Sequence, residues 1–303
     1  MGVFVSPWNL ILGVGRWRGP PPELMAYLNG DLLPHSEAIA GMRSDGSGSG
    51  GGLYDAERTF NGRVFKLREH LQRLFNSLEG GHVDPGLTID EMVDATLTVI
   101  EANEKSRQPG DEFVVGQVVS SGPSLSNSAP VVDVLIYCQA LDFSDFARSY
   151  STGIRIFTLA TYSPPARRQT RGPQVPDDDV WALKTDQKGY ITECTRANFM
   201  FVKDGKIMLP DRSTALPGIS MATVLELADS LGIPVEEGRY NTSDVYAAEG
   251  AYISGTRYCL LPVSTINGVA VPGPVPSEVT SRLTEAWSEM VGLDIIQQAL
   301  DHI

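Results

Sequence analysis

The chain of 303 residues is poor in lysine, cysteine and histidine. Its three cysteines form no CxxC pair and its four histidines lack metal-ligand spacing, so we expect no disulfide framework and no metal site. No apolar run reaches the ~18 residues that a membrane span needs, and the N-terminus lacks the basic region and cleavage site of a signal peptide. These absences predict a cytoplasmic protein without a membrane partner.

Basic residues are also scarce, with 24 Lys and Arg against 37 Asp and Glu and a formal net charge of −13. Only six of the 24 are lysine. Nucleic acids and anionic membranes bind basic protein surfaces, so we expect neither as a partner of this acidic chain. Apolar residues make up 42% of the chain, which is enough for a real core, and the length suits one large domain or two modest ones.

The pattern of turns and apolar residues predicts an α+β protein of mostly antiparallel sheets with flanking helices. Asn-Gly or Asp-Gly pairs, which favour tight hairpins, occur at 29–30, 61–62, 204–205 and 267–268. Helical periodicity predicts helices over 66–78, after a capping box at 88–91, after 217–220 and over 276–291. We expect Leu97 and Met290 on the buried faces of two of these helices.

Four parts are predicted along the chain. They are an irregular N-terminal extension (1–24), a smaller N-terminal α+β domain (25–142), an interdomain connection (143–153) and a larger C-terminal domain (154–303). Two stretches lack periodicity: 46–52 consists of Gly and Ser, and 163–179 is rich in Pro, Arg and Asp. Both predict loops.

Several short motifs could bind an anion. A helix start at 216–220 would offer the N–H groups of Ile219 and Ser220 to a phosphate, and a Ser-Gly-Thr turn ending at Thr256 could cradle one. Arg58 could add a guanidinium, and Glu193 could hold a protonated ring nitrogen. Each alone is also explained by an ordinary cap, turn or surface side chain.

Together these motifs resemble the class IV aminotransferases, which include branched-chain and D-amino-acid aminotransferases and aminodeoxychorismate lyase. The resemblance runs from about Tyr27 to the C-terminus. It is carried by YLNG at 27–30, LYDAER at 53–58, FKLREHLQRL at 65–74, ITECTRANF at 191–199, LPGIS at 216–220 and SGT at 254–256.

The resemblance implies the two-domain fold type IV architecture, with pyridoxal 5′-phosphate (PLP) between the domains and a homodimer. It implies transfer of an amino group from an amino acid to a 2-oxo acid, or a lyase reaction in the aminodeoxychorismate lyase branch. The residues that match the family's cofactor site are Arg58, Glu193, Asn198, Ile219, Ser220 and Thr256. Tyr54 could line the substrate pocket, or simply pack in the core, and Arg257 could meet a substrate carboxylate, or lie on the surface.

One family feature is missing. The lysine that forms the Schiff base with PLP is expected 30 to 35 residues before the Glu193 position, yet no lysine lies between Lys105 and Lys184. Lys184, only nine residues before Glu193, is the remaining candidate for the catalytic lysine, although it does not match the family's position. Arginine cannot replace it, because its pKa above ~12 makes it neither nucleophile nor base. Covalent attachment of PLP is therefore in doubt.

Four interpretations stay open at this point. The chain could be an aminotransferase with an unusual lysine. It could be a different enzyme on the same scaffold that binds PLP or another phosphorylated ligand non-covalently and uses Tyr162, Cys194 or a carboxylate. It could be a non-catalytic relative, either one that binds such a ligand or a scaffold subunit that pairs with an active homologue. Finally, the aberrant stretches at 40–52 and 163–180 could be local sequence errors in an ordinary aminotransferase gene. The sequence predicts neither the substrate nor the stereochemistry.

Overall fold

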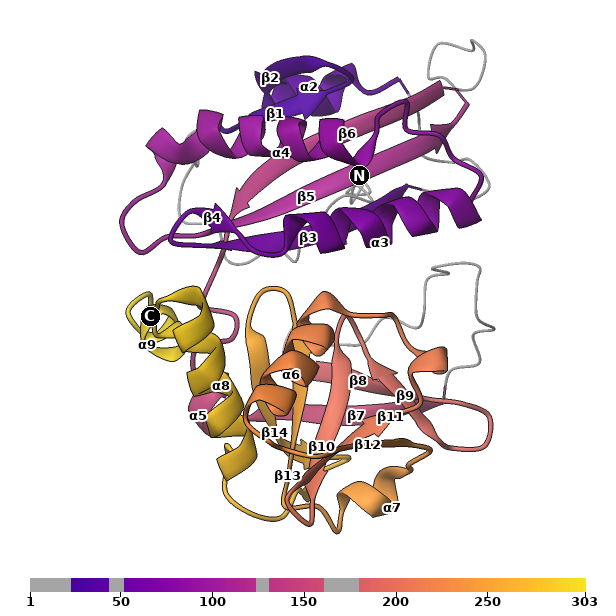
Figure 1. Cartoon of the computed structure of the whole chain (residues 1–303), viewed down its shortest axis with the longest axis vertical. Coiled ribbons are helices and arrows are strands. Elements are labelled where there is room, and N and C mark those ends of the chain that lie inside the picture. Colours follow the sequence, from indigo (N-terminus) through magenta and orange to yellow (C-terminus); the bar gives the residue numbers. More distant parts are fainter. Residues whose placement is uncertain (1–22, 44–51, 124–130, 161–179) are drawn as a thin grey trace, which may run out of the picture.

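The computed structural model describes residues 23–43, 52–123, 131–160 and 180–303. The described chain forms two sheets, one on each side of the segment 141–153 (Figure 1). Most of the Gly/Ser stretch, the whole of 163–179 and Tyr162 lie outside the described residues.

The N-terminal sheet has the strand order β2-β1-β6-β5-β3-β4, and every neighbouring pair is antiparallel. Its strands are β1 (Met25–Leu28), β2 (Asp31–Pro34), β3 (Leu53–Phe60), β4 (Arg63–Val64), β5 (Phe113–Gly122) and β6 (Val131–Ala140). The predicted hairpins at 29–30 and 61–62 are confirmed, because both residues of each turn have positive φ.

Helices α3 (Leu67–Gly80) and α4 (Ile89–Asn103) lie against this sheet, and α2 (His35–Gly41) lies beside β1 (Figure 1). A short 3-10 turn, η1 (Glu104–Ser106), follows α4. The predicted capping box is present, since the Thr88 side chain accepts from the Glu91 N–H and the Glu91 carboxylate accepts from the Thr88 N–H.

The predicted burial of Leu97 and Met290 is wrong, because each is 46% exposed. The buried face of α4 runs instead through Met92, Thr96 and Asn103. Thr96 and Asn103 hide their polar groups in hydrogen bonds, to the Met92 carbonyl and to the backbone of Met25. Polar residues thus occupy core positions when their polar groups are hydrogen-bonded, whereas a prediction from hydrophobicity alone would place them at the surface.

The C-terminal sheet has the order β12-β11-β10-β13-β14-β7-β8-β9, with β15 paired to β14. Its strands are β7 (Ile154–Ala160), β8 (Val180–Thr185), β9 (Ile191–Cys194), β10 (Asn198–Lys203), β11 (Lys206–Pro210), β12 (Val235–Gly238), β13 (Gly250–Gly255), β14 (Cys259–Ile266) and β15 (Val269–Ala270). The pairs β11/β12, β7/β14 and β7/β8 are parallel and the remaining pairs are antiparallel.

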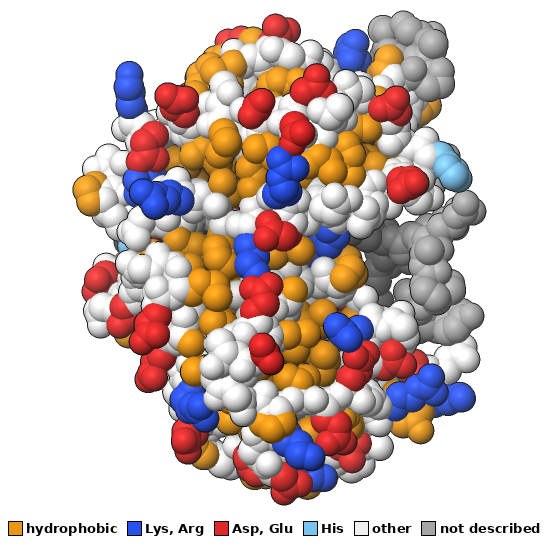
Figure 2. All heavy atoms as spheres, viewed as in Figure 1, with side chains coloured by type: hydrophobic (Ala, Val, Ile, Leu, Met, Phe, Trp, Pro, Cys, Tyr) orange, Lys and Arg blue, Asp and Glu red, His pale blue; other side chains and the backbone are white. Residues whose placement is uncertain are grey.

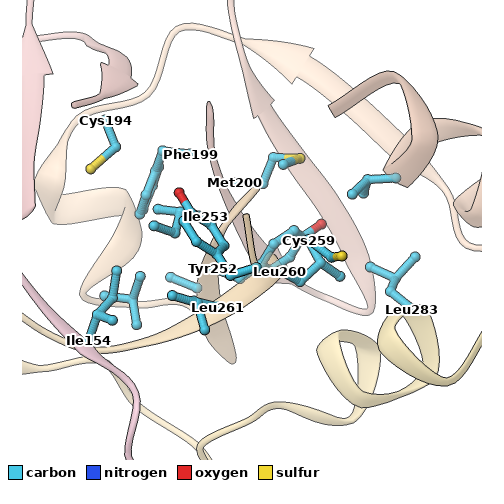
Figure 3. Packing of buried hydrophobic residues seen from close by; sticks show 14 of the residues in the cluster. Ile154, Cys194, Phe199, Met200, Tyr252, Ile253, Cys259, Leu260, Leu261 and Leu283 are labelled. Atoms are coloured by element: carbon cyan, nitrogen blue, oxygen red, sulfur yellow. The ribbon is translucent and has the colours of Figure 1, made fainter. Parts of the chain in front are cut away.

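The C-terminal core fills the space between this sheet and its helices. Those helices are η2 (Arg212–Thr214), α6 (Ile219–Ser230), α7 (Thr242–Val245), α8 (Glu278–Val291) and α9 (Ile295–Leu300). In Figure 3, Phe199 and Tyr252 from the central strands and Leu283 from α8 all belong to this cluster. Burial of such side chains contributes ~1.5–3 kcal/mol each.

The connecting segment is part of the C-terminal core. Phe143, Phe146 and Tyr150 are buried in the same cluster as the C-terminal strands, and α5 (Ser149–Thr152) packs on β14. The Tyr150 hydroxyl donates to the carbonyl of Tyr258 at 2.7 Å. The link between the domains is therefore anchored firmly to the second of them.

A buried polar cluster lies between the N-terminal sheet and α3. Asp55 contacts His70 Nδ1 at 2.8 Å and accepts two hydrogen bonds from Arg73, at 2.6 and 2.8 Å. Glu57 is fully buried beside it and accepts from Gln117 Nε2 at 2.6 Å. Alternation along β3 turns these two carboxylates toward α3 and Ala56, which lies between them, toward the opposite face.

On the face seen in Figure 2, acidic and basic side chains are interspersed over both domains rather than gathered by sign. None of the described helices is both long enough and apolar enough to cross a membrane.

Candidate active site

Arg58 is the first predicted site residue that the structure places at the boundary between the domains. It lies on β3, is 2% exposed, and its guanidinium packs 4.1 Å from the centre of the Phe60 ring. Nε donates to the Thr59 carbonyl at 3.1 Å, Nη1 to the Arg257 carbonyl at 2.9 Å and Nη2 to Gln298 Oε1 at 3.2 Å. An N-terminal-domain cation is thus fixed against the backbone of the C-terminal domain.

The Ser-Gly-Thr turn meets the same strand from the other domain. The Thr256 hydroxyl donates to the Ala56 carbonyl at 3.2 Å, two residues from Arg58 on β3. The Ser254 hydroxyl is buried and has no hydrogen-bond partner among the residues that the structure describes. A buried hydroxyl without a partner is costly, and it marks a place where a polar ligand group would be accommodated.

The start of α6 is held beside this turn by Asn198. Asn198 Nδ2 donates to the Leu216 carbonyl at 2.9 Å. On β10, Asn198 lies opposite Ser254 of the antiparallel strand β13. Gly218 is the N-cap, and a Cβ there would lie 2.0 Å from Asn198 Oδ1, so any larger residue would displace the Asn198 amide.

No side chain caps α6 within the described chain. The N–H groups at its first turn, those of Ile219 and Ser220, therefore provide the positive end of a 12-residue helix. Such a terminus favours an anion.

Glu193 is the second charged residue of the predicted site, and it has two partners. Its Oε1 lies 2.7 Å from Lys184 Nζ, and its Oε2 accepts from the Leu216 N–H at 3.0 Å. The pair forms because β8 and β9 are antiparallel neighbours, with Leu183 opposite Cys194. Lys184, the candidate catalytic lysine, is therefore the ion-pair partner of the predicted ring-nitrogen carboxylate.

The two predicted substrate residues lie apart from each other. Tyr54 is half-buried and packs with the Val118 and Tyr137 cluster on the N-terminal sheet. The Arg257 guanidinium is held by Asp145 at 2.9 Å, and its backbone carbonyl receives Arg58. Their substrate roles stay predictions.

The alternative nucleophile Cys194 is disfavoured. Its side chain is fully buried, and burial raises the pKa of the thiol to about 12, so it stays protonated near neutrality.

Two groups of polar residues near the site were assigned no role from the sequence. One is the cluster of Asp55, His70 and Arg73; the FKLREHLQRL motif, which contains His70 and Arg73, could have pointed to it. Arg73 also donates to the Pro217 carbonyl at 3.2 Å, next to the start of α6. The other is Gln298 with Glu112, for which no local motif exists. Lys66 adds a further contact between the domains, an ion pair of 2.5 Å with Glu226 on α6.

Comparison with known proteins agrees with this geometry. The family model described as "Amino-transferase class IV" matches residues 166–266. A probable branched-chain-amino-acid aminotransferase of Rickettsia felis is 28% identical over 247 residues, which cover 76% of this chain and 82% of that protein.

Solved structures show the same fold. The Escherichia coli branched-chain amino acid aminotransferase has a TM-score of 0.76 at 22% identity, covering 89% of this chain and 95% of the other. The branched-chain aminotransferase from the archaeon Thermoproteus uzoniensis, solved with norvaline, has a TM-score of 0.70 at 22% identity, covering 89% and 95%. A further branched-chain amino acid aminotransferase, solved with pyridoxamine 5′-phosphate, has a TM-score of 0.73 at 22% identity.

These matches confirm the predicted α+β architecture, since the likeness spans both sheets. They also confirm the resemblance drawn from the short motifs. Residues 166–266 thus match the class IV aminotransferase family, and the chain is similar to branched-chain members of that family over most of its length.

Proposed function

We propose that this chain binds PLP at the domain boundary and transfers an amino group from an amino acid to a 2-oxo acid. The phosphate would be held by Arg58, by Thr256 and by the N–H groups of Ile219 and Ser220. Glu193 would accept a hydrogen bond from the protonated ring nitrogen, with Asn198 fixing the helix start. When bound, PLP supplies an electron sink for the bonds at the substrate α-carbon.

The observation that carries this proposal is the convergence of three anion-binding elements from two domains. The contacts of Arg58 with the Arg257 carbonyl and of Thr256 with the Ala56 carbonyl bring β3 against the end of β13. Asn198 ties the uncapped start of α6 to the same strand end. The unpartnered Ser254 hydroxyl adds a buried polar group there. The chemistry of these residues fits a phosphate ester, which supports the proposal.

Lys184 suits a role at the ring-nitrogen end better than a covalent one. In PLP the ring nitrogen and the carbon bearing the aldehyde occupy opposite positions of the ring. An ammonium 2.7 Å from Glu193 is therefore placed near the nitrogen, and as an ion-paired cation it has no free electron pair for attack. This contact favours a second candidate, a relative that binds PLP or another phosphorylated ligand without transferring an amino group.

Titration of the purified protein with PLP, followed by a single turnover with leucine, isoleucine or valine, separates the candidates. These substrates are chosen because the relatives are named for branched-chain amino acids. Conversion of bound PLP to pyridoxamine phosphate is the expected result for an aminotransferase. Binding without conversion supports the second candidate. Absence of PLP binding overturns the aminotransferase and leaves only a relative that binds another phosphorylated ligand. Borohydride reduction with peptide mapping then identifies any lysine that carries the cofactor.

Lys184→Met is expected to strengthen PLP binding two- to five-fold, because Glu193 loses a cation that competes with the ring nitrogen. The gain is small since both side chains are partly exposed, where ion pairs contribute ~0–1 kcal/mol. Lys188→Met is the matched control, with the same charge change four residues away, and should leave the affinity unchanged. Loss of PLP binding in Lys184→Met alone would show that this lysine anchors the cofactor.

We further propose a homodimer in the cytoplasm. The family resemblance supports the dimer, and sedimentation velocity tests it. The reducing compartment is supported by Cys138, Cys194 and Cys259, all free and buried.

A further inference from the structure

The C-terminal helix α9 reaches back to the N-terminal domain through Gln298. Gln298 Oε1 accepts from Arg58 Nη2 at 3.2 Å. Its Nε2 donates to the Gly110 carbonyl and to Glu112 Oε1, both at 3.0 Å. One side chain near the end of the chain thus contacts both the predicted phosphate-binding arginine and the loop before β5.

These contacts fix which way the Gln298 amide faces. Both hydrogens of Nε2 have carbonyl or carboxylate acceptors, so the amide oxygen is directed at Arg58. The reverse orientation would set Nε2 against a guanidinium and the oxygen against two acceptors. Gln298 therefore has one stable orientation, and it presents an acceptor to Arg58.

Glu112 makes this arrangement rigid. It is 1% exposed and accepts from the Thr59 hydroxyl and the Asn61 N–H, both at 2.6 Å, and from the Gly62 N–H at 3.2 Å. The carboxylate thus ties the β3–β4 hairpin, which follows Arg58 directly, to Gln298.

The guanidinium of Arg58 is consequently held on three sides. Nε, Nη1 and Nη2 each donate one hydrogen bond within the described chain, to Thr59, Arg257 and Gln298 respectively. The Cys259 thiol also interacts with this guanidinium. A guanidinium has five N–H groups, so these contacts leave one or two terminal N–H groups for a phosphate oxygen.

We propose that Gln298 is a positioning residue for the phosphate site: it sets the direction of the Arg58 guanidinium toward a phosphate monoester. The C-terminal helix is then part of the phosphate-binding apparatus, although it is far from it in sequence. This inference rests on the proposed function, because it assumes that Arg58 binds the phosphate of PLP.

The test compares Gln298→Met with Gln297→Met by calorimetric titration with PLP and with pyridoxal, which lacks the phosphate. Methionine keeps the side-chain length and removes both hydrogen-bonding groups. Gln297, the neighbouring glutamine, is a matched control because its Nε2 contacts only Asp301 among the described residues. We expect PLP affinity to fall about tenfold in Gln298→Met and to stay unchanged in Gln297→Met, with pyridoxal affinity unchanged in both.

Equal loss of PLP and pyridoxal affinity in Gln298→Met would overturn the proposal, since a general structural defect does not distinguish the phosphate. Unchanged PLP affinity would also overturn it. Arg58→Ala shows whether the inference about Gln298 or the proposed phosphate site is at fault. If it weakens PLP binding while Gln298→Met does not, only this inference fails; if it leaves PLP binding intact, the phosphate site itself is wrong.

Should Gln298→Met fold poorly, Gln298→Asn gives the same answer. Asparagine keeps the amide but is one methylene shorter, so it cannot contact Arg58 and the loop at 110–112 together. PLP affinity should again fall with pyridoxal affinity preserved, and an equal effect on both ligands would overturn the proposal.

Discussion

Replacing Arg58 with alanine is expected to weaken PLP binding about 100-fold. Arginine–phosphate hydrogen bonds are charge-assisted, and losing two of them costs ~3 kcal/mol, which corresponds to that factor. The low exposure of Arg58 increases the effect, because a buried charge is little screened by solvent. Calorimetric titration with PLP measures it.

Arg58→Lys separates charge from geometry, since lysine keeps the charge but lacks the planar fork. It should recover only part of the affinity. Arg212→Ala, a control at an exposed arginine paired with Glu237, should bind PLP normally. Melting temperatures of all variants show whether lost binding reflects lost folding. A folded Arg58→Ala with native affinity would refute the phosphate site.

We expect the unfolding free energy of the native protein to fall as pH rises, and we expect Glu57→Gln to remove that fall. Burial raises the pKa of Glu57 well above its usual value, and the negative charge of neighbouring Asp55 raises it further. The hydrogen bond from Gln117 lowers this pKa but does not outweigh burial. Glu57 Oε2 and Gln117 Oε1 are both buried acceptors without a partner among the described residues. A proton on Glu57 would supply the missing donor.

The sign follows from proton linkage. Above the ordinary glutamate pKa of 4.5 the unfolded chain releases this proton, while the folded chain keeps it up to the raised pKa. The unfolding free energy therefore falls as pH rises through that window, by up to about 1.4 kcal/mol per pH unit. Glutamine needs no proton and offers its own N–H to Gln117, so the variant should match the native protein near pH 4 and exceed it at pH 8.

Urea denaturation at pH 4 to 8 measures this difference. Glu285→Gln, at an exposed position of α8, is the control and should leave the pH dependence as it is. A Glu57→Gln protein with the native pH profile would show that Glu57 is ionised in the fold.

Asp55 acts in the opposite direction and in a different window. Burial tends to raise the pKa of Asp55, but hydrogen bonds from His70 and Arg73 outweigh it, and the pKa is lowered. Its contribution to stability is present above its ordinary pKa of 3.8 and is lost as pH falls below that value. Asp55 therefore contributes to the loss of stability toward acid pH, and Glu57 contributes to the loss toward alkaline pH.

Local signals allowed part of the fold to be predicted from the sequence. Asn-Gly and Asp-Gly turns mark hairpins because few residues adopt positive φ, and all four predicted turns do so. The order of short motifs predicted the resemblance to class IV aminotransferases, and the family match at 166–266 supports it. Helix faces were less predictable, because Thr96 and Asn103 are core residues whose polar groups find partners only in the folded chain.

Residue types in a fixed order were sufficient to predict the fold class and the resemblance to class IV aminotransferases, while the residues assigned to the cofactor site stay predictions. How those residues are supported became visible only in the folded chain. Lys184 joins Glu193 through strand pairing, and Gln298 reaches Arg58 across 240 positions of chain. A contact across 240 positions leaves no periodic or local pattern, because it forms only when separate sheets and helices pack together.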